Sequence, residues 1–166
     1  MGRYRPPASP KSAYITRAGF LRLEAEQAAI WERRRRVTQA LAAAAAEGDR
    51  SENAEYIYRK KELREIDRRI RYLQRRLPLL KVVDHPPSQT DRVFFAAWVS
   101  LEGEDGSERR YRIVGPDEID QGPGYISMDS PLARALMKRR LDEQVEVRTP
   151  GGRAVYWITG IDYAAP

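Results

Sequence analysis

The sequence predicts an α+β protein with a long helical hairpin before residue 84 and a small antiparallel sheet with one packed helix after residue 91. Two observations carry this prediction. Before residue 81, apolar residues recur at alternating steps of three and four along two stretches, which is the spacing of paired helices. After residue 91, apolar residues alternate with polar ones between glycine-containing turns, which is typical of strands. Helices followed by a run of strands favour an α+β fold.

The first helical stretch is expected to begin after Thr16, whose hydroxyl suits a helix N-cap. Its repeating positions are Phe20, Leu23, Gln27, Ile30, Arg34, Val37, Leu41 and Ala44. The alanine run at residues 42–46 favours a helix and lets a neighbouring helix approach closely. An arm of roughly 27 residues, rising about 1.5 Å per residue, reaches about 40 Å.

The second helical stretch is expected to begin near Asp49 or Ser51. Its repeating positions are Leu63, Ile66, Ile70, Leu73, Leu77 and Leu80. Gly48 fits the left-handed position that ends a helix, and Pro78 should bend or end the last turn. Because only a short turn separates the two stretches, they should form an antiparallel coiled-coil hairpin with its tip at residues 48–56.

The C-terminal half reads as a sheet domain. Strands are predicted at residues 93–101, 108–114, 125–128, 144–148 and 154–161. Ser130 followed by Pro131 is typical of a helix start, and this helix should run to about Arg140. The expected organisation is a disordered tail at residues 1–13, a hairpin domain at 14–83, a linker at 84–91 and a sheet domain at 92–166.

Composition excludes several classes of function. The chain of 166 residues has no cysteine, which removes disulfides and cysteine-based zinc sites. Its single histidine, His85, lies in the predicted linker, so catalysis that depends on a histidine is not expected. No apolar run approaches the roughly 18 residues of a membrane span, and no apolar segment of a secretory signal follows the first residues. We therefore expect a soluble cytoplasmic protein without a membrane partner.

The net charge of +6 is unevenly distributed along the chain. Residues 50–76 hold about ten basic and about five acidic side chains, whereas residues 84–166 hold about ten basic and about fourteen acidic ones. The second arm is thus cationic and the C-terminal half is mildly anionic. This difference suggests two different partners.

Three acids follow one another at steps of three around the tip: Asp49, Glu52 and Glu55. The spacing of Asp49 and Glu52 has the form of a capping box, and from spacing alone helix capping is the favoured interpretation. The alternative is that both are oxygen ligands of Mg²⁺, which commonly binds one or two protein carboxylates together with phosphate oxygens and water. Two exposed carboxylates cannot complete that shell, so the isolated protein should bind no metal. Another macromolecule would supply the remaining ligands, as in two-metal phosphodiester cleavage.

A stripe of basic residues follows the second arm on the side away from the apolar seam. Its members are Lys60, Arg64, Arg68, Arg71 and Arg75, with Arg59, Lys61, Arg69 and Arg76 beside them. A solvated face with helix-stabilising pairs such as Glu65 with Arg69 is one interpretation. The excess of about five positive charges favours the other, which is sequence-independent attraction of nucleic-acid phosphates.

The aromatic residues leave two roles open. Near the tip, Tyr56 could stack on a nucleotide base or pack where the helices meet, while packing or plain exposure is favoured for Tyr58. In the C-terminal half, the expected core includes Phe94, Trp98, Tyr111, Trp157 and Ile158. The segment 125–136 is the better interface candidate there, because a turn, a strand end and a helix start converge on it.

The tip sequence Gly48-Asp49-Arg50-Ser51-Glu52-Asn53-Ala54-Glu55-Tyr56 strongly resembles the tip motif of the bacterial Gre transcript-cleavage factors, members of the GreA/GreB family of transcription elongation factors. Residues 60–69, 93–99, 111–115 and 130–136 are similar to the GreB branch of that family. The resemblance extends from about Tyr14 to Tyr163. The tip shows no departure from the motif, which argues against related members that bind polymerase but lack cleavage activity.

The resemblance implies a coiled-coil hairpin, a C-terminal domain of FKBP-like fold, and insertion of the hairpin through the secondary channel of RNA polymerase. Asp49 and Glu52 would help to hold a second Mg²⁺ and the attacking water in the polymerase active site. The other tip residues would support them: Arg50, Ser51, Asn53, Glu55 and Tyr56. The polymerase would then hydrolyse the 3′ end of backtracked RNA, so the chain itself is not expected to be an enzyme.

The resemblance also assigns the two remaining surfaces. The family's basic patch would guide the extruded RNA and corresponds to Arg59, Lys60, Lys61, Arg64, Arg68 and Arg71. Ser130, Pro131 and Leu132 would dock on the polymerase rim. DNA binding is also expected. An FKBP-like fold does not by itself imply prolyl isomerase activity.

Two other functions remain open at this stage. The main alternative is a binding-only competitor of the same polymerase channel. A third hypothesis is a general nucleic-acid-binding coiled coil with an unrelated adaptor domain. A monomer is expected, because an intramolecular hairpin needs no second chain.

Overall fold

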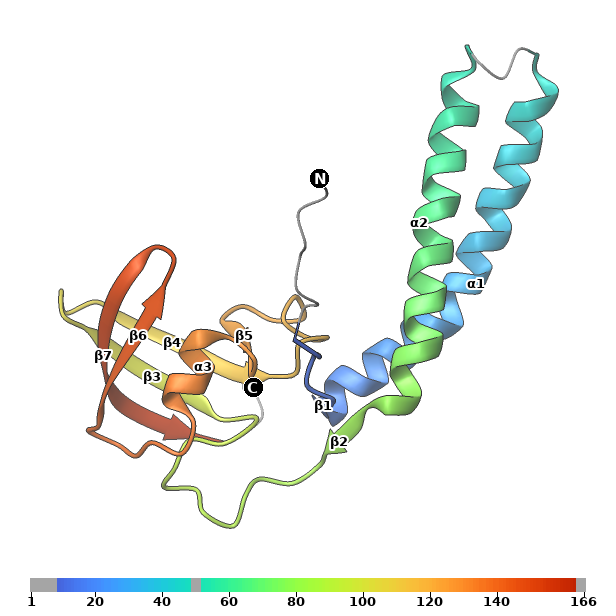
Figure 1. Ribbon diagram of the computed structural model, residues 1–166. Helices are drawn as coiled ribbons and strands as arrows, with labels where there is room; N and C mark the ends of the chain where they lie inside the picture. Colours follow the sequence, from blue (N-terminus) through green and yellow to red (C-terminus); the bar gives the residue numbers. More distant parts are fainter. Residues whose placement is uncertain (1–8, 49–51, 164–166) are drawn as a thin grey trace, which may run out of the picture. The chain divides into compact units, whose positions relative to one another are not determined.

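The structure is a computed structural model that describes residues 9–48 and 52–163 (Figure 1). The chain forms two compact units. One comprises Phe20–Leu80, and the other combines the residues up to Gly19 with those from Lys81 onward. The first unit is helical and the second holds the sheet, so the predicted α+β class is confirmed.

The helical unit is an antiparallel hairpin of α1 (Arg17–Ala46) and α2 (Ala54–Arg76), followed by the short 3-10 helix η1 (Leu77–Leu79) (Figure 1). The most buried apolar residues of the two helices all lie at predicted repeating positions: Leu23, Ile30, Val37, Ala44, Ile66, Ile70 and Leu73. Ile30, Val37, Ile66 and Ile70 pack in one cluster. The apolar seam predicted from the spacing is therefore confirmed.

The helix ends follow local chemistry. Thr16 caps α1 as predicted, because its hydroxyl oxygen accepts a hydrogen bond of 3.1 Å from the Gly19 amide. The prediction that the second helix begins near Asp49 or Ser51 is wrong, because Asn53 caps α2 and the helix begins at Ala54. At the other end, Pro78 lies in η1, where its missing N–H ends the regular α-helical bonding.

Ion pairs join the two helices beside the seam. Arg34 Nε lies 2.7 Å from Asp67 Oδ1, so this seam arginine is neutralised by the facing helix. Arg69 binds the Glu26 carboxylate through two bonds of 2.5 and 2.8 Å. Arg69, which the sequence analysis named as an example of a residue paired within its own helix, therefore forms a bridge between the two helices.

The second unit contains a five-stranded sheet in the order β5-β4-β3-β7-β6. The strands are β3 (Trp98–Gly103), β4 (Glu108–Val114), β5 (Tyr125–Ser127), β6 (Gln144–Thr149) and β7 (Gly152–Asp162). The prediction of a purely antiparallel sheet is wrong at one edge, where β5 pairs with β4 in parallel. The ten-residue connection between β4 and β5 is long enough for β5 to run in the same direction as β4, whereas a tight hairpin turn joins antiparallel strands.

One face of this sheet is covered by α3 (Pro131–Leu136). Ala133 and Leu136 of this helix share a buried cluster with Val99, Leu101 and Ile113 of the central strands. The helix is shorter than predicted, because Met137 leaves the helical conformation and Lys138 has a positive φ of 67°. The strand predicted at residues 93–101 begins only at Trp98.

A two-stranded parallel pair, β1 (Tyr14–Thr16) with β2 (Lys81–Val83), also belongs to the second unit. The buried Glu118 carboxylate holds this region by accepting hydrogen bonds from the Thr16 amide at 2.8 Å and from the Gly115 amide at 3.0 Å. Neither strand was predicted, since three residues are too few to show a period. Within the described residues, no helix combines the length and apolarity of a membrane span.

Candidate functional site

On either side of residues 49–51, the described residues Glu47, Gly48 and Glu52 are exposed. α1 ends at Ala46, and Gly48 follows with a φ of 129°, a conformation that L side chains rarely adopt. Asp49, Arg50 and Ser51 lie outside the described residues. Glu52 is the one predicted metal-binding acid that the structure describes, and it is exposed.

Asn53 connects the ends of the two helices. Its side-chain oxygen accepts a hydrogen bond of 3.1 Å from the Tyr56 amide, which caps α2. Its Nδ2 donates a bond of 2.7 Å to the carbonyl oxygen of Ala44, one of the unpaired carbonyls at the end of α1. One amide side chain therefore satisfies a donor of α2 and an acceptor of α1.

This geometry tests the capping interpretation of Glu52. Since Asn53 is the cap of α2, the capping interpretation is wrong for Glu52. Within the described part of the chain, Glu52 forms no hydrogen bond and no ion pair. Its carboxylate oxygens therefore remain open to an outside ligand, and an unshared carboxylate is the donor type that Mg²⁺ prefers.

The acid that follows is different. Glu55 accepts a hydrogen bond of 2.8 Å from Arg59 Nε one helical turn later, so its charge is already paired. Tyr56 is half-buried, with the Lys60 ammonium 5.7 Å from the centre of its ring. Among the described residues, no group of three or more histidine, cysteine or acidic side chains could hold a metal ion.

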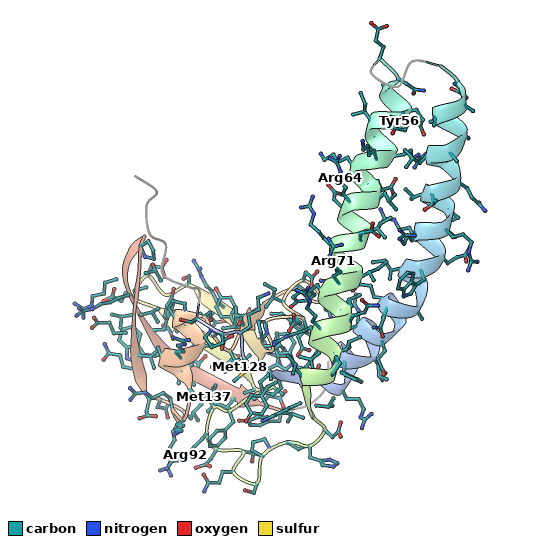
Figure 2. All side chains as sticks on the ribbon, turned by 45° about the vertical axis from the view of Figure 1, so that its right-hand side comes forward. Tyr56, Arg64, Arg71, Arg92, Met128 and Met137 are labelled. Carbon is teal, nitrogen blue, oxygen red and sulfur yellow. The ribbon has the colours of Figure 1, made fainter. Side chains whose placement is uncertain are left out.

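The basic residues of α2 divide into two sets. Arg59 binds both Glu55 and Glu62, and these hydrogen bonds, with Glu55 first, hold the pKa of its guanidinium above the ordinary value. Arg64, Arg68 and Arg71 are exposed and form no ion pair within the described part of the chain. Figure 2 shows Arg64 and Arg71 on the side of α2 away from α1.

Lys60 and Lys61 are also exposed and extend the open cationic surface toward the tip. At the other end of α2, the surface continues into a groove of about 470 Å³. Its walls are Arg68, Arg71, Tyr72, Arg75, Arg76 and Leu79. Of the six arginines and lysines predicted to bind nucleic acid, only Arg59 forms ion pairs within the described residues of the hairpin.

The three predicted docking residues lie at the start of α3. Ser130 Oγ accepts a bond of 3.2 Å from the Ala133 amide and so caps this helix. Pro131 is exposed, whereas Leu132 packs against the sheet core. Ser12 adds a feature that the sequence did not indicate, since its amide and hydroxyl both bind the Asp129 carboxylate, at 2.9 and 2.6 Å.

Two aromatic residues predicted in the core lie elsewhere. Trp157 is 37% exposed, and Trp98 lies outside the buried cluster. Trp98 instead contacts Tyr125, Arg110 and Arg112 on the other face of the sheet. Ile158 is buried and Tyr111 packs against the core, as predicted.

Comparisons with known proteins agree over nearly the whole chain. Residues 13–82 match the family described as transcription elongation factor, N-terminal, and residues 88–163 match transcription elongation factor GreA/GreB, C-terminal. Transcription elongation factor GreB of Xanthomonas axonopodis pv. citri is 56% identical over 167 residues, which cover 99% of each chain. GreB of Pseudomonas aeruginosa is 56% identical over 164 residues, 98% of each chain.

One solved structure that matches the chain is that of GreA factor homolog 1 (Gfh1) of Thermus thermophilus. It is 24% identical, with a TM-score of 0.40, over 92% of this chain and 99% of that one. These values are too low to transfer any property of that protein to this chain.

Proposed function

The chain belongs to the GreA/GreB family of transcription elongation factors, and we propose that it binds RNA polymerase and stimulates cleavage of backtracked RNA. In this proposal the hairpin enters the secondary channel of the polymerase and brings its tip to the polymerase active site. The polymerase performs the hydrolysis, and the chain supplies groups that the active site lacks. Arrested elongation complexes then resume synthesis.

The reaction is the hydrolysis of one phosphodiester bond. The water oxygen forms a bond to phosphorus, the bond from phosphorus to the 3′ oxygen breaks, and that oxygen takes up a proton. A new 3′ hydroxyl remains in the active site, from which synthesis continues. The Mg²⁺ of the polymerase would stabilise charge on the reacting oxygens and favour ionisation of the water.

In this proposal Glu52 contributes a carboxylate to that shared site, and Asp49 is its partner. The observation that carries the proposal is the state of Glu52, which is exposed, unpaired within the described chain, and placed just outside the Asn53 cap. A free carboxylate at the end of a rigid hairpin has no evident structural task here. Its proposed task is to provide a ligand to a metal site that the polymerase alone leaves incomplete.

The open cations of α2 would hold the displaced RNA. Lys60, Lys61, Arg64, Arg68 and Arg71 are all exposed on this helix. Charges of this kind attract phosphates without reading the bases, which suits RNA of any sequence. Arg59 would instead act within the hairpin, through its two carboxylates.

Docking on the polymerase is assigned to the sheet unit, at Ser130, Pro131 and Leu132. Pro131 is exposed at the start of α3, where the Ser130 cap fixes the turn. The resulting complex is proposed to contain one copy of the chain, in the cytoplasm.

The direct test is to add the purified protein to a stalled elongation complex and to measure the length of the RNA. Shortening of the RNA from its 3′ end in the presence of Mg²⁺, followed by extension when nucleotides are added, is the expected result. Binding to polymerase with no shortening at any Mg²⁺ concentration would identify a competitor of the channel instead. Tight binding of RNA without polymerase would favour a general nucleic-acid-binding protein.

A further inference from the structure

Four side chains form a cluster on the face of the sheet that α3 does not cover: Trp98, Arg110, Arg112 and Tyr125. The strand register places Trp98 opposite Arg112, and Arg112 opposite Tyr125. Directly paired residues point to the same face of a sheet, so these three lie in one row. Arg110 is two residues before Arg112 on β4 and shares that face.

The cluster is held together by contacts between cations and rings. Arg110 Cζ lies 4.7 Å from the centre of the Trp98 ring. Arg112 Cζ lies 5.9 Å from the Trp98 ring and 5.5 Å from the Tyr125 ring, and the two rings meet edge to face at 5.8 Å. Such contacts stabilise a guanidinium, but they do not supply a counter-charge.

Arg112 is a buried cation without an anion. It is 9% exposed and forms no ion pair within the described residues. Its Nη1 donates to Tyr125 Oη at 2.9 Å, and its Nε points to the Ala96 carbonyl at 3.4 Å. Its Nη2 forms no hydrogen bond within the described residues. This atom is not fully buried, so solvent can reach it. Buried charges are usually paired, so an unpaired one calls for a ligand.

Two backbone features hold this donor in place. Ala96, whose carbonyl faces Arg112, has a left-handed φ of 70°, a conformation that is unfavourable for a residue other than glycine. Gly124 has a φ of 75°, and a Cβ on it would lie 2.8 Å from the Arg110 carbonyl oxygen. Because glycine has no Cβ, β5 can approach β4 closely, and this brings Tyr125 beside Arg112.

The cluster has more donors than acceptors. Because Tyr125 Oη accepts a hydrogen bond from Arg112, its own O–H is directed elsewhere, and it meets no acceptor among the described side chains. Arg110 Nη2 lies 3.4 Å from Asp162 Oδ2, which is a long ion pair, and both side chains are more than half exposed. A ligand for this surface must therefore bring negative acceptor oxygens.

A carboxylate fits better than a nucleic-acid phosphate. The C-terminal half holds about fourteen acidic against about ten basic side chains, so it repels a polyanion but accepts a single charge. The Arg110 guanidinium lies over the Trp98 ring, so a base could stack on that face only by displacing it.

We infer that this cluster binds an aspartate or glutamate side chain of RNA polymerase. The carboxylate would accept hydrogen bonds from Arg112 Nη2 and from the Tyr125 hydroxyl, with Arg110 beside it. The inference rests on the proposed polymerase binding and adds a second, electrostatic contact to the proposed contact at the start of α3.

The test measures the affinity of the labelled full-length protein for core RNA polymerase. Tyr125→Phe removes one hydroxyl and Arg110→Gln one exposed charge, and each should raise Kd by about twofold to tenfold. The maximal cleavage rate at saturating protein should not change, because the tip is intact. Arg109→Gln is the matched control, since it removes the neighbouring charge on the opposite face and should leave Kd unchanged.

Three results would overturn the inference. Variants that bind polymerase as tightly as the wild type, with the same thermal stability, would show that the cluster only stacks internally. Weaker binding of a labelled RNA oligonucleotide, with polymerase binding unchanged, would identify a phosphate as the ligand. Failure of the wild-type protein to bind polymerase would overturn the proposed function and this inference together.

Discussion

Asn53 decides how the tip of the hairpin is built. It is the only described side chain that bonds both helix ends there, accepting from the Tyr56 amide and donating to the Ala44 carbonyl. The sequence placed Asn53 in the tip but offered Asp49 and Glu52 as the caps. Spacing alone could not identify which residue caps α2. Aspartate, serine and asparagine are all good caps, and four of the residues 49–53 are of capping or acidic type.

Replacing Asn53 tests this role. Asn53→Ala should destabilise the start of α2 by about 1 kcal/mol, because the cap is lost. Hydrogen exchange of the Tyr56 amide should become faster. Asn53→Asp is the control, since it keeps the acceptor for Tyr56 and loses only the donor to Ala44, so the Tyr56 amide should stay protected. Equal protection in the wild type and Asn53→Ala would show that Asn53 is not the cap.

At the scale of the elements, Glu62 links the two helices of the hairpin. It accepts a hydrogen bond of 2.9 Å from Arg33 of α1 and one of 3.0 Å from Arg59 of α2. These bonds, with Arg33 first, hold the pKa of the Glu62 carboxyl below its ordinary value. A carboxyl whose pKa is lower in the folded than in the unfolded state stabilises the folded protein at pH values above its pKa in the unfolded state. This stabilisation is lost as the pH falls through its pKa in the folded state.

We therefore expect the hairpin to lose stability in acid partly through Glu62. In thermal unfolding followed by circular dichroism from about pH 6 to about pH 3, Glu62→Gln should reduce the fall in melting temperature. The matched control is Glu65→Gln, which changes an exposed glutamate on the same helix. If both variants follow the wild-type curve, the Glu62 bridge does not contribute to acid sensitivity.

The open stripe of α2 makes its own prediction. Arg64→Glu together with Arg68→Glu should weaken cleavage of long-backtracked RNA more than release of a dinucleotide, because only the longer RNA extends along the stripe. Arg35→Glu with Arg36→Glu makes the same change of charge on α1 and serves as the control. Gel analysis of complexes with defined backtrack lengths gives both rates, and an equal loss for short and long RNA would contradict RNA guidance.

The helices could be predicted from the sequence better than the strands, for a physical reason. The seam of the hairpin repeats over many turns, so single ambiguous residues such as Arg34 do not hide it. The run at residues 93–101 is apolar almost throughout, and such a run does not reveal which face Trp98 occupies. The parallel pairing of β5 depends on distant partners, so no local pattern encodes it.

At the scale of the whole molecule, the two units have different chemical tasks. The hairpin offers unpaired cations and an open carboxylate, whereas the sheet unit offers a helix start and a buried arginine with spare donors. The uneven charge of the sequence indicated this division, but not which arginines are free. That distinction needs the tertiary structure, because Arg59 and Arg64 look alike in the sequence and only Arg59 meets carboxylates.

The central claim is that the tip acids take part in the cleavage step and not in binding. Its most direct measurement determines polymerase affinity and the maximal rate of RNA cleavage for Asp49→Ala and Glu52→Ala. Glu47→Ala, which removes an exposed acid directly before the tip, is the control. We predict that all three bind within about twofold of the wild type. Cleavage should fall to the level of polymerase alone for Asp49→Ala and Glu52→Ala, and stay normal for Glu47→Ala. Parallel loss of affinity and cleavage, or full cleavage by Glu52→Ala, would contradict the claim.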